Sequence, residues 1–277
     1  MKIITDTGSI ITKEKAEELD IKLLPLQVAI DGKNFRDYFD VSNEDFIEMT
    51  KTAIPVSSQP AVGEVMDEYE DKEETLHITM TSGLSATYNS AFGIIQSSDI
   101  DHVTLFNSKT LAGTQQYLVD LAAKLRNNNT VKSIVERMNH CLIECQSFLI
   151  PEDFDYLKRG GRLSPIAAKL GGLIKIKPIV VQTEGSQKLE KFGFGRNWKK
   201  AIRNIIDEMI KNGVNYKHKI YISHAENEKV ANIANKMLKE FIENSDIEIL
   251  RLTPAMITQG GPGCVAIQYI LKDPLFK

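Results

Sequence analysis

Apolar and polar residues alternate over residues 76–80, and the pattern then changes to a helical one. Leu76, Ile78 and Met80 alternate with polar residues as in a half-buried strand, and apolar residues at helical spacing follow from position 88. The residues between them read T-S-G-L-S-A-T, with Gly83 to relax the backbone and Ser85 to cap a helix. The pattern predicts a strand, a hydroxyl-rich loop and a helix.

The predicted loop has the chemistry of a small anion site. A helix N-terminus carries free N–H groups and partial positive charge, and Ser82 and Ser85 add hydroxyls beside it. Neither G-x-x-x-x-G-K-[ST] nor G-x-G-x-x-G occurs here, which favours a compact anion such as a carboxylate or one phosphate over a nucleotide. An equally weighted alternative is that Ser and Gly serve only the turn and the cap.

The same strand, loop and helix order occurs elsewhere in the first half. A strand over residues 2–5 leads to Asp6, and a strand over residues 102–107 leads to Ser108. This repetition predicts an α/β fold with a parallel sheet, in which the carboxyl ends of the strands lie along one edge. We expect Asp6, Ser108 and the 81–85 loop to gather there, with Asp6 either ordering the site or only opening a turn.

Other patterns complete the first half of the chain. An apolar run predicts a strand over residues 23–30, while Thr12, Ser42 and Thr130 are expected to cap helices. Two prolines hold the segment P-V-S-S-Q-P at residues 55–60 out of helix, and the segment presents Ser57 and Ser58. A strand over residues 147–150 ends at a proline, so we place the boundary between two α/β domains there, at 1–150 and 151–277.

The second half begins with a predicted helix over residues 152–158 and the segment Arg159-Gly160-Gly161-Arg162. Guanidinium groups bind carboxylate or phosphate in bidentate fashion and glycines permit close backbone approach, although a solvated surface turn is the equally weighted alternative. Ser164-Pro165 predicts a helix start. A strand over residues 174–183 contains Pro178, which favours an edge strand or a bulge, and residues 184–186 are expected to turn it back along residues 189–194.

The remaining chain alternates predicted helices and strands. The helices cover residues 196–210 and a stretch ending near 241, and the strands cover residues 219–223 and 247–252. His224 follows a strand, where a structural role is more common than acid–base chemistry. The run Gln259-Gly260-Gly261-Pro262-Gly263 predicts unusual backbone geometry or close approach to a ligand.

Composition narrows the classes of protein. The chain has 277 residues, of which 42% are hydrophobic, and a net charge of -3, so bulk electrostatics favour neither nucleic acid nor a membrane surface. No apolar stretch is long enough for stable membrane insertion, and three cysteines are too few for a disulfide framework, so we expect a cytoplasmic protein. Cys141 and Cys145, four apart on a predicted helix, are expected to be buried apolar residues rather than metal ligands.

Seven short motifs, taken together and in this order, resemble the DegV family, which includes the fatty-acid-binding subunits of bacterial fatty acid kinase. The resemblance spans nearly the whole chain, and its motifs are T-D-T-G-S at residues 5–9, S-S-Q-P at 57–60, T-S-G-L-S-A-T-Y-N-S-A at 81–91, N-S-K-T at 107–110, Y-L-K-R-G-G-R-L-S at 156–164, I-K-P-I at 176–179 and G-G-P-G at 260–263.

The resemblance implies a cytoplasmic carrier of a long-chain fatty acid rather than an enzyme, with no cofactor and no metal. It implies a ligand site in the cleft between two α/β domains, from which the carboxylate is presented to a separate ATP-dependent kinase subunit for phospholipid synthesis. The implied carboxylate-binding residues are Ser57, Ser82, Gly83, Ser85, Arg162 and Gln259, supported by Asp6, Ser58, Ser108, Gly260 and Gly261. Family members commonly have His-Thr where this chain has Gln259-Gly260, and glutamine can donate a hydrogen bond but carries no charge.

An alternative interpretation is an enzyme that acts on a small phosphorylated or carbonyl metabolite at the same cleft, with His224 or Asp6 in proton transfer. No paired nucleophile and base, metal-ligand cluster or phosphate-binding lysine motif supports it. A purely structural role is a third possibility.

Overall fold

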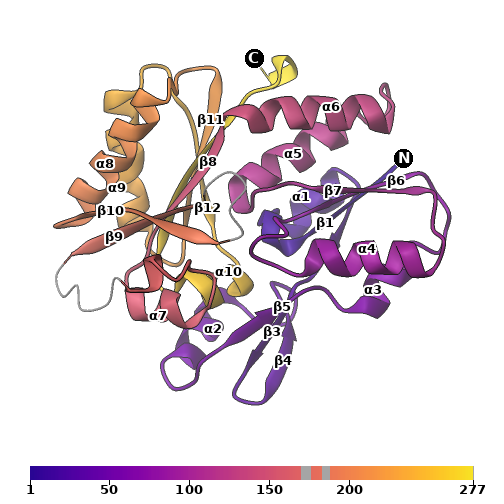
Figure 1. The fold of residues 1–277 in the computed structure, drawn as a ribbon, viewed down its shortest axis with the longest axis horizontal. Helices are drawn as coiled ribbons and strands as arrows, with labels where there is room; N and C mark the ends of the chain where they lie inside the picture. Colours follow the sequence, from indigo (N-terminus) through magenta and orange to yellow (C-terminus); the bar gives the residue numbers. More distant parts are fainter. Residues whose placement is uncertain (170–175, 183–187, 277) are drawn as a thin grey trace. The chain divides into compact units, whose positions relative to one another are not determined.

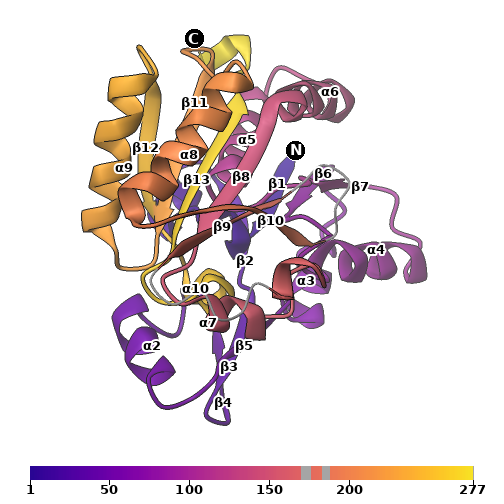
Figure 2. The same cartoon turned by 60° about the vertical axis from the view of Figure 1, so that its left-hand side comes forward.

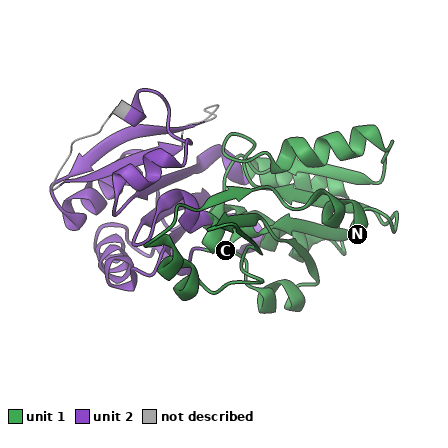
Figure 3. Cartoon of the chain, turned by 90° about the horizontal axis from the view of Figure 1, so that it is seen from below, with its two compact units in different colours: residues 1–140, 253–255 green, residues 141–252, 256–277 purple. Residues whose placement is uncertain are grey.

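The computed structural model describes residues 1–169, 176–182 and 188–276. The chain forms two compact units, of residues 1–140 with 253–255 and of residues 141–252 with 256–277 (Figure 3). The division at 140 lies ten residues before the expected boundary at 150. The strand between these two positions, β8 (Cys145–Ile150), belongs to the second unit because it hydrogen-bonds with β9 (Lys177–Gln182) and β13 (Val265–Leu271).

The first unit contains the predicted parallel sheet (Figure 1). Its strands lie in the order β2-β1-β6-β7, and every neighbouring pair is parallel. The strands are β1 (Lys2–Asp6), β2 (Ile21–Leu24), β6 (Thr75–Thr79) and β7 (Val103–Asn107). β1 and β6 are buried along their whole length, as expected for central strands covered on both faces.

Helices cover the two faces of this sheet. On one face, Val65 and Ala91 pack with Ile4 in an apolar core, and on the other Gln115 reaches Thr5. The helices of the unit are α1 (Lys13–Glu18), α2 (Asn43–Thr50), α3 (Val62–Asp67), α4 (Thr87–Ser97), α5 (Ala112–Leu125) and α6 (Val131–Cys141), with a 3-10 turn at Thr7–Ser9. Thr12, Ser42 and Thr130 cap α1, α2 and α6 as predicted, because each hydroxyl accepts a backbone N–H three residues later.

The predicted single strand over residues 23–30 is wrong. Pro25 separates β2 from β3 (Gln27–Ile30), and β3 belongs to a small antiparallel sheet in the order β4-β3-β5. Its other strands are β4 (Lys33–Arg36) and β5 (Val56–Ser58). Proline cannot donate to a ladder, so the apolar run changes sheets at this residue.

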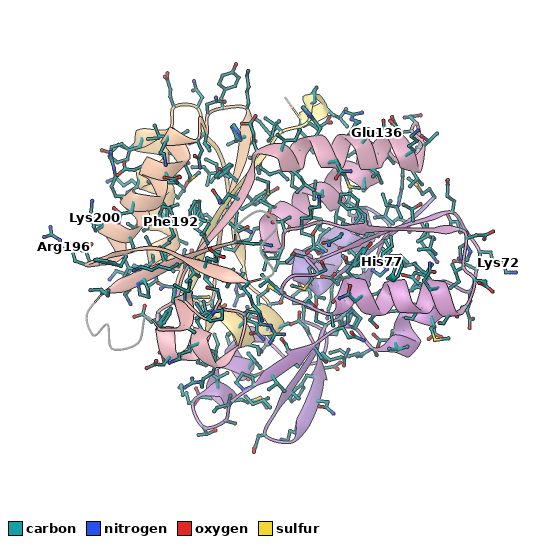
Figure 4. The ribbon with its side chains drawn as sticks, viewed as in Figure 1. Lys72, His77, Glu136, Phe192, Arg196 and Lys200 are labelled. Atoms are coloured by element: carbon teal, nitrogen blue, oxygen red, sulfur yellow. The ribbon has the colours of Figure 1, made fainter. Side chains whose placement is uncertain are left out.

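A buried polar pair lies within the apolar core of the first unit. His77 on β6 (Figure 4) is fully buried. Its Nδ1 lies 2.5 Å from the hydroxyl oxygen of Tyr69. Burial lowers the pKa of His77 from its usual 6.5 to about 3, so the imidazole is neutral at physiological pH. The folded state therefore resists protonation of a group that the unfolded chain protonates readily.

This pair makes stability depend on pH. The contribution of neutral His77 is complete above pH ~6.5 and is lost as the pH falls toward 3, with a loss of roughly 2 kcal/mol between pH 7 and 5. We expect His77→Asn, which keeps an acceptor for Tyr69, to be less stable at pH 7 but to lack this loss. The raised pKa values of Asp6 and Asp37 make both proteins more stable as the pH falls, which is opposite to the effect of His77. Comparing the urea unfolding of wild type and variant at pH 7 and pH 5 therefore isolates the contribution of His77. Equal pH dependence in the two proteins would contradict the prediction.

The second unit is built on a mixed six-stranded sheet in the order β10-β9-β8-β13-β11-β12. Only β11 and β12 pair in parallel, and all other neighbours are antiparallel. The strands not yet given are β10 (Leu189–Gly195), β11 (His218–His224) and β12 (Asp246–Arg251). β13 lies in the interior of the sheet although it is the last strand of the chain.

Two amphipathic helices, α8 (Trp198–Lys211) and α9 (Glu228–Phe241), lie side by side on one face of this sheet (Figures 1 and 2). Ile202, Ile206 and Leu238 are among the residues that pack them onto the sheet in one large apolar core. Arg196 and Lys200 are exposed at the start of α8 (Figure 4). The shorter elements are α7 (Phe154–Arg159), α10 (Pro254–Gly260) and 3-10 turns at Leu142–Glu144, Ala167–Lys169 and Pro274–Phe276.

The predicted pairing of the strand containing Pro178 with residues 189–194 is confirmed, because β9 and β10 are antiparallel. β9 lies between β10 and β8, and β8 pairs only with the last part of β9, so Pro178 lies outside the stretch that is paired with β8. A register shift between Lys191 and Gly193 adds a bulge in β10. The turn expected at residues 184–186 lies outside the described residues.

One helix prediction for this unit is wrong. Cys145 is not on a helix with Cys141, because α6 ends at Cys141 and Cys145 begins β8. Ser164-Pro165 leads into a 3-10 helix at Ala167–Lys169, and the Ser164 hydroxyl accepts the N–H of Ala167; residues 170–175, where the predicted helix would continue, lie outside the described residues. Conversely, α10 was not predicted, because its seven residues are too few for a clear apolar period.

Candidate functional site

Asp6 holds two loops together at the carboxyl end of β1. One carboxylate oxygen accepts the N–H of Met80 at 2.8 Å, and the other accepts the N–H of Gly8 at 2.9 Å and the Gln115 amide at 3.4 Å. Burial outweighs these hydrogen bonds and raises the pKa of Asp6 to about 6. A side chain on Gly8 would lie 2.6 Å from this carboxylate, so the T-D-T-G-S motif needs glycine at that position.

The hydroxyl-rich loop is joined to the loop after β7. Asn107 accepts the N–H of Ser82 at 3.3 Å, and its amide nitrogen donates to the Ser82 hydroxyl at 2.7 Å. The backbone of Thr81 donates to the carbonyl of Thr110 at 2.8 Å. The structure therefore brings the loops that follow β1, β6 and β7 to one edge of the sheet, as the parallel topology predicts.

Asn107 is a residue that the sequence reasoning did not single out. Ser108, which it did, is fully buried and bonds within its own turn, since its hydroxyl donates to the carbonyl of Thr110 at 3.0 Å. Its position could have indicated this role, because Asn107 is the last residue of a predicted strand. Its amide side chain can both donate and accept hydrogen bonds. Asn107 orients the Ser82 hydroxyl oxygen, and the hydrogen of that hydroxyl can still be donated.

Hydroxyl groups also lie at the start of α4. Ser85 is not the residue directly before the helix, since that position is Ala86, but its hydroxyl accepts the N–H of Thr87 at 3.3 Å. The hydroxyls of Ser85 and Thr87 lie 2.8 Å apart. Ser82, Gly83 and Ser85 are half-buried. This end of α4 therefore combines hydroxyl donors with the positive end of a helix dipole.

The S-S-Q-P motif meets the same helix. Ser57 pairs with Val28 in the small sheet and is half-buried, while Ser58 is exposed. The amide of Gln59 donates to the Ser90 hydroxyl on α4 at 2.7 Å. This contact ties the segment carrying Ser57 to the helix that begins at the hydroxyl-rich loop, a link that the sequence motif alone did not indicate.

The second unit carries the predicted arginine and glycine groups. The half-buried Arg162 donates to the carbonyl of Gly160 at 2.8 Å, and burial lowers the pKa of its guanidinium below the usual value. Arg159 instead stacks on Tyr156, with 4.9 Å from its guanidinium carbon to the ring centre. The two arginines around the double glycine thus differ in solvent exposure, since Arg159 is exposed and Arg162 is half-buried.

The end of α10 and the glycine-rich run that continues from it pack on the same segment. A Cβ built on Gly160 would lie 2.4 Å from Oε1 of Gln259, so the Gln259 side chain covers this glycine. Gly261 has φ +83°, and a Cβ there would lie 3.0 Å from the Tyr156 ring. The unusual backbone geometry predicted for this run is confirmed. Arg162, Gln259 at the end of α10 and the glycines beside them therefore form one group within the second unit.

His224 serves the backbone around it. It is almost fully buried at the end of β11, and its Nδ1 accepts the N–H of Asn227 at 3.2 Å. Burial lowers the pKa of His224, with the carboxylates of Glu226 and Glu228 opposing. Asn227 caps α9 and donates to the carbonyl of Gly263 at 2.7 Å. This arrangement gives His224 a role in holding the turn before α9.

The described residues contain neither a helix that could span a membrane nor a cluster of metal-binding side chains. No helix in residues 1–169, 176–182 or 188–276 is both long enough and apolar enough to cross a membrane. Within the same ranges, no three or more His, Cys, Asp or Glu side chains are grouped so that they could hold a metal ion.

Comparisons with known proteins agree with this architecture. The chain is 30% identical to a DegV domain-containing protein of Staphylococcus aureus, with 98% of each chain covered. Its fold matches the crystal structure of DegV, a fatty acid binding protein from Bacillus subtilis, with TM-score 0.83, 26% identity and coverage of 98% and 99%. It also matches a fatty-acid-binding DegV family protein from Thermus thermophilus, with TM-score 0.88, 20% identity and the same coverage.

These matches define a class of two-unit α/β proteins whose first unit is built on a parallel sheet. A family model described as "Uncharacterised protein, DegV family" matches residues 1–272. The chain belongs to the DegV family.

Proposed function

We propose that this protein is a cytoplasmic carrier that binds a long-chain fatty acid and presents its carboxylate to a separate ATP-dependent fatty acid kinase subunit. The observation that carries the proposal is the hydroxyl-rich loop, in which Asn107 orients Ser82 beside the N-terminus of α4. The family resemblance implies that Arg162 and Gln259 contribute further donors, and these two residues lie in one group within the second unit. The fatty acid binding described for the Bacillus subtilis relative supports the choice of anion.

The energetics suit a fatty acid. Each buried methylene contributes roughly 0.8 kcal/mol, so the acyl chain provides most of the affinity. A carboxylate removed from water needs compensating donors, and serine hydroxyls, a helix N-terminus and a guanidinium are such donors. The polar groups therefore fix the orientation of the head group, and an oxygen left accessible can receive a phosphoryl group in the partner protein.

The alternative of an enzyme has less support. His224 and Asp6 were its candidate proton-transfer groups, and both are buried and bonded to backbone N–H groups. A candidate general base has to come within hydrogen-bond distance of the proton that it removes. Turnover of a phosphoester or carbonyl metabolite by the pure protein would reverse this preference.

The proposal is tested by identifying the bound lipid. Purified protein is denatured and extracted with organic solvent, and the extract is analysed by mass spectrometry. We expect about one fatty acid per chain, and conversion of added fatty acid to acyl phosphate only when a kinase subunit and ATP are present. Absence of a stoichiometric acyl chain, together with no binding of added palmitate or oleate, would defeat the proposal.

Ser82→Ala and Ser85→Ala are expected to weaken fatty-acid binding by roughly 2- to 10-fold each, the value of one hydrogen bond of about 0.5–1.5 kcal/mol. Isothermal titration with palmitate measures the affinity, and thermal unfolding serves as the control. Ser98→Ala, at an exposed position at the other end of α4, is the matched hydroxyl deletion and should change affinity least. If the variants lost stability as much as affinity, Ser82 and Ser85 would be residues that support the fold rather than residues that bind the carboxylate.

A further inference from the structure

Asp37 is a buried carboxylate outside the residues assigned to the ligand. It follows β4 and is fully buried. One oxygen accepts the hydroxyls of Thr7 at 2.6 Å and Thr253 at 2.9 Å, and the other accepts the N–H of Ala255 at 2.8 Å. Three donors from two distant parts of the sequence therefore converge on one side chain.

The position of Asp37 is itself fixed. Its backbone N–H donates to the carbonyl of Leu26 at 2.8 Å, and the N–H of Leu26 donates to the Thr7 hydroxyl at 3.0 Å. Thr7, Leu26 and Asp37 thus form a closed set of hydrogen bonds in the first unit. An acceptor held in this way keeps its partners in place with little loss of side-chain entropy on binding them.

The partners of Asp37 lie at the start of α10. Thr253 precedes the helix, Pro254 is its first residue and Ala255 its second. The first N–H groups of a helix lack partners within the helix and are usually capped by the residue just before it. Here the capping carboxylate comes from 218 residues earlier in the chain, and its negative charge also suits the positive end of the helix.

The other end of α10 carries proposed ligand groups. The helix has seven residues and ends at Gly260, so Gln259 lies about 6 Å along the axis from Ala255 at 1.5 Å per residue. Gln259 covers Gly160, and Gly261 follows with positive φ. A short helix with intact backbone hydrogen bonds moves as a unit, so its anchored start determines where its last residues lie.

We propose that Asp37 is a positioning residue for the fatty-acid carboxylate: by holding Thr253 and Ala255 it sets α10, and through α10 it orients Gln259 and the backbone of Gly260 and Gly261 toward the head group. This role rests on the proposed function. The residues Thr253–Ala255 belong to the first unit, whereas the residues before and after them belong to the second. The proposal gives this short segment a direct effect on fatty-acid affinity.

The test uses substitutions at the far partner of Asp37. Thr253→Val removes the hydroxyl with little change of shape, and Thr253→Ser keeps it. Palmitate affinity is measured at pH 8, where Asp37 is ionised, because burial raises its pKa to about 6. We expect Thr253→Val to weaken binding roughly 3- to 10-fold, Asp37→Asn about 10-fold or more, and Thr253→Ser to bind like the wild type. Amide hydrogen exchange over residues 255–260 should accelerate in the first two variants.

A double-mutant cycle separates positioning from general loosening. If Asp37 acts through α10, Thr253→Val adds little to the loss of affinity caused by Gln259→Ala, whereas it adds fully to the loss caused by Ser82→Ala. Unchanged affinity of Thr253→Val, or full additivity with Gln259→Ala, would overturn this role while leaving the proposed function intact. Failure of the wild type to bind any fatty acid would overturn both.

Discussion

Replacement of Arg162 by alanine is expected to weaken fatty-acid binding by roughly 10- to 100-fold while leaving the fold intact. A hydrogen bond to a charged partner contributes about 1.5–3 kcal/mol, more than a neutral serine hydroxyl. Arg162 is half-buried and donates to the carbonyl of Gly160, a neutral acceptor and therefore a weaker partner than a carboxylate. The measurement is palmitate affinity by calorimetry, together with urea unfolding of each variant.

Two matched variants sharpen this test. Arg159→Ala removes the same side chain three residues earlier, where the guanidinium stacks on Tyr156 and is exposed, and should change affinity little. Arg162→Lys keeps the charge but loses the planar fork, so its affinity should fall between those of alanine and wild type. Equal effects of alanine at positions 159 and 162 would show that Arg162 does not bind the head group.

Replacement of Gly195 by alanine is expected to destabilise the second unit by about 3 kcal/mol or more. A Cβ at this position would lie 2.2 Å from the backbone nitrogen of Ala201 and 2.7 Å from its Cα, and backbone in the first turn of α8 cannot move aside as a side chain can. The last residue of β10 therefore has to be glycine for α8 to pack against it.

Gly93 provides the opposite case with the same substitution. It lies within α4, it is exposed, and no atom lies within 4 Å of the Cβ that alanine would add. Gly93→Ala should stabilise the protein by roughly 0.5–1 kcal/mol, because alanine favours helix. Urea unfolding midpoints of both variants check the pair, and a stable Gly195→Ala protein would show that β10 and α8 do not approach closely.

The parallel sheet was predictable because its information is local. Each strand has its own apolar pattern and is followed by a polar loop and a helix, so the order of elements in the sequence already implies the topology. The chain passes from the parallel sheet to the small antiparallel sheet at Pro25. In the sequence, the only indication of this change is a proline within an apolar run. Which of the two halves pairs with β1 depends on partners far away in the chain, which no local pattern shows.

The candidate site divides in the same way. Ser82, Ser85 and Arg162 stand in loops whose composition indicates an anion site. Asn107 and Asp37 were missed because their importance comes from contacts with residues 25 and 218 positions away. The short helix α10, which has no clear apolar period, also lacks an adjacent cap, since its first turn is capped by a distant carboxylate.

The interior position of β13 has a consequence for synthesis on the ribosome. Both edges of β13 are paired, with β8 on one side and β11 on the other, so the six-stranded sheet stays divided until residues 265–271 have emerged. The strands of the parallel sheet, in contrast, are all translated by residue 107. The first unit can therefore begin to fold while the second is still being made, and β8 and β11 must wait with exposed edges that invite aggregation.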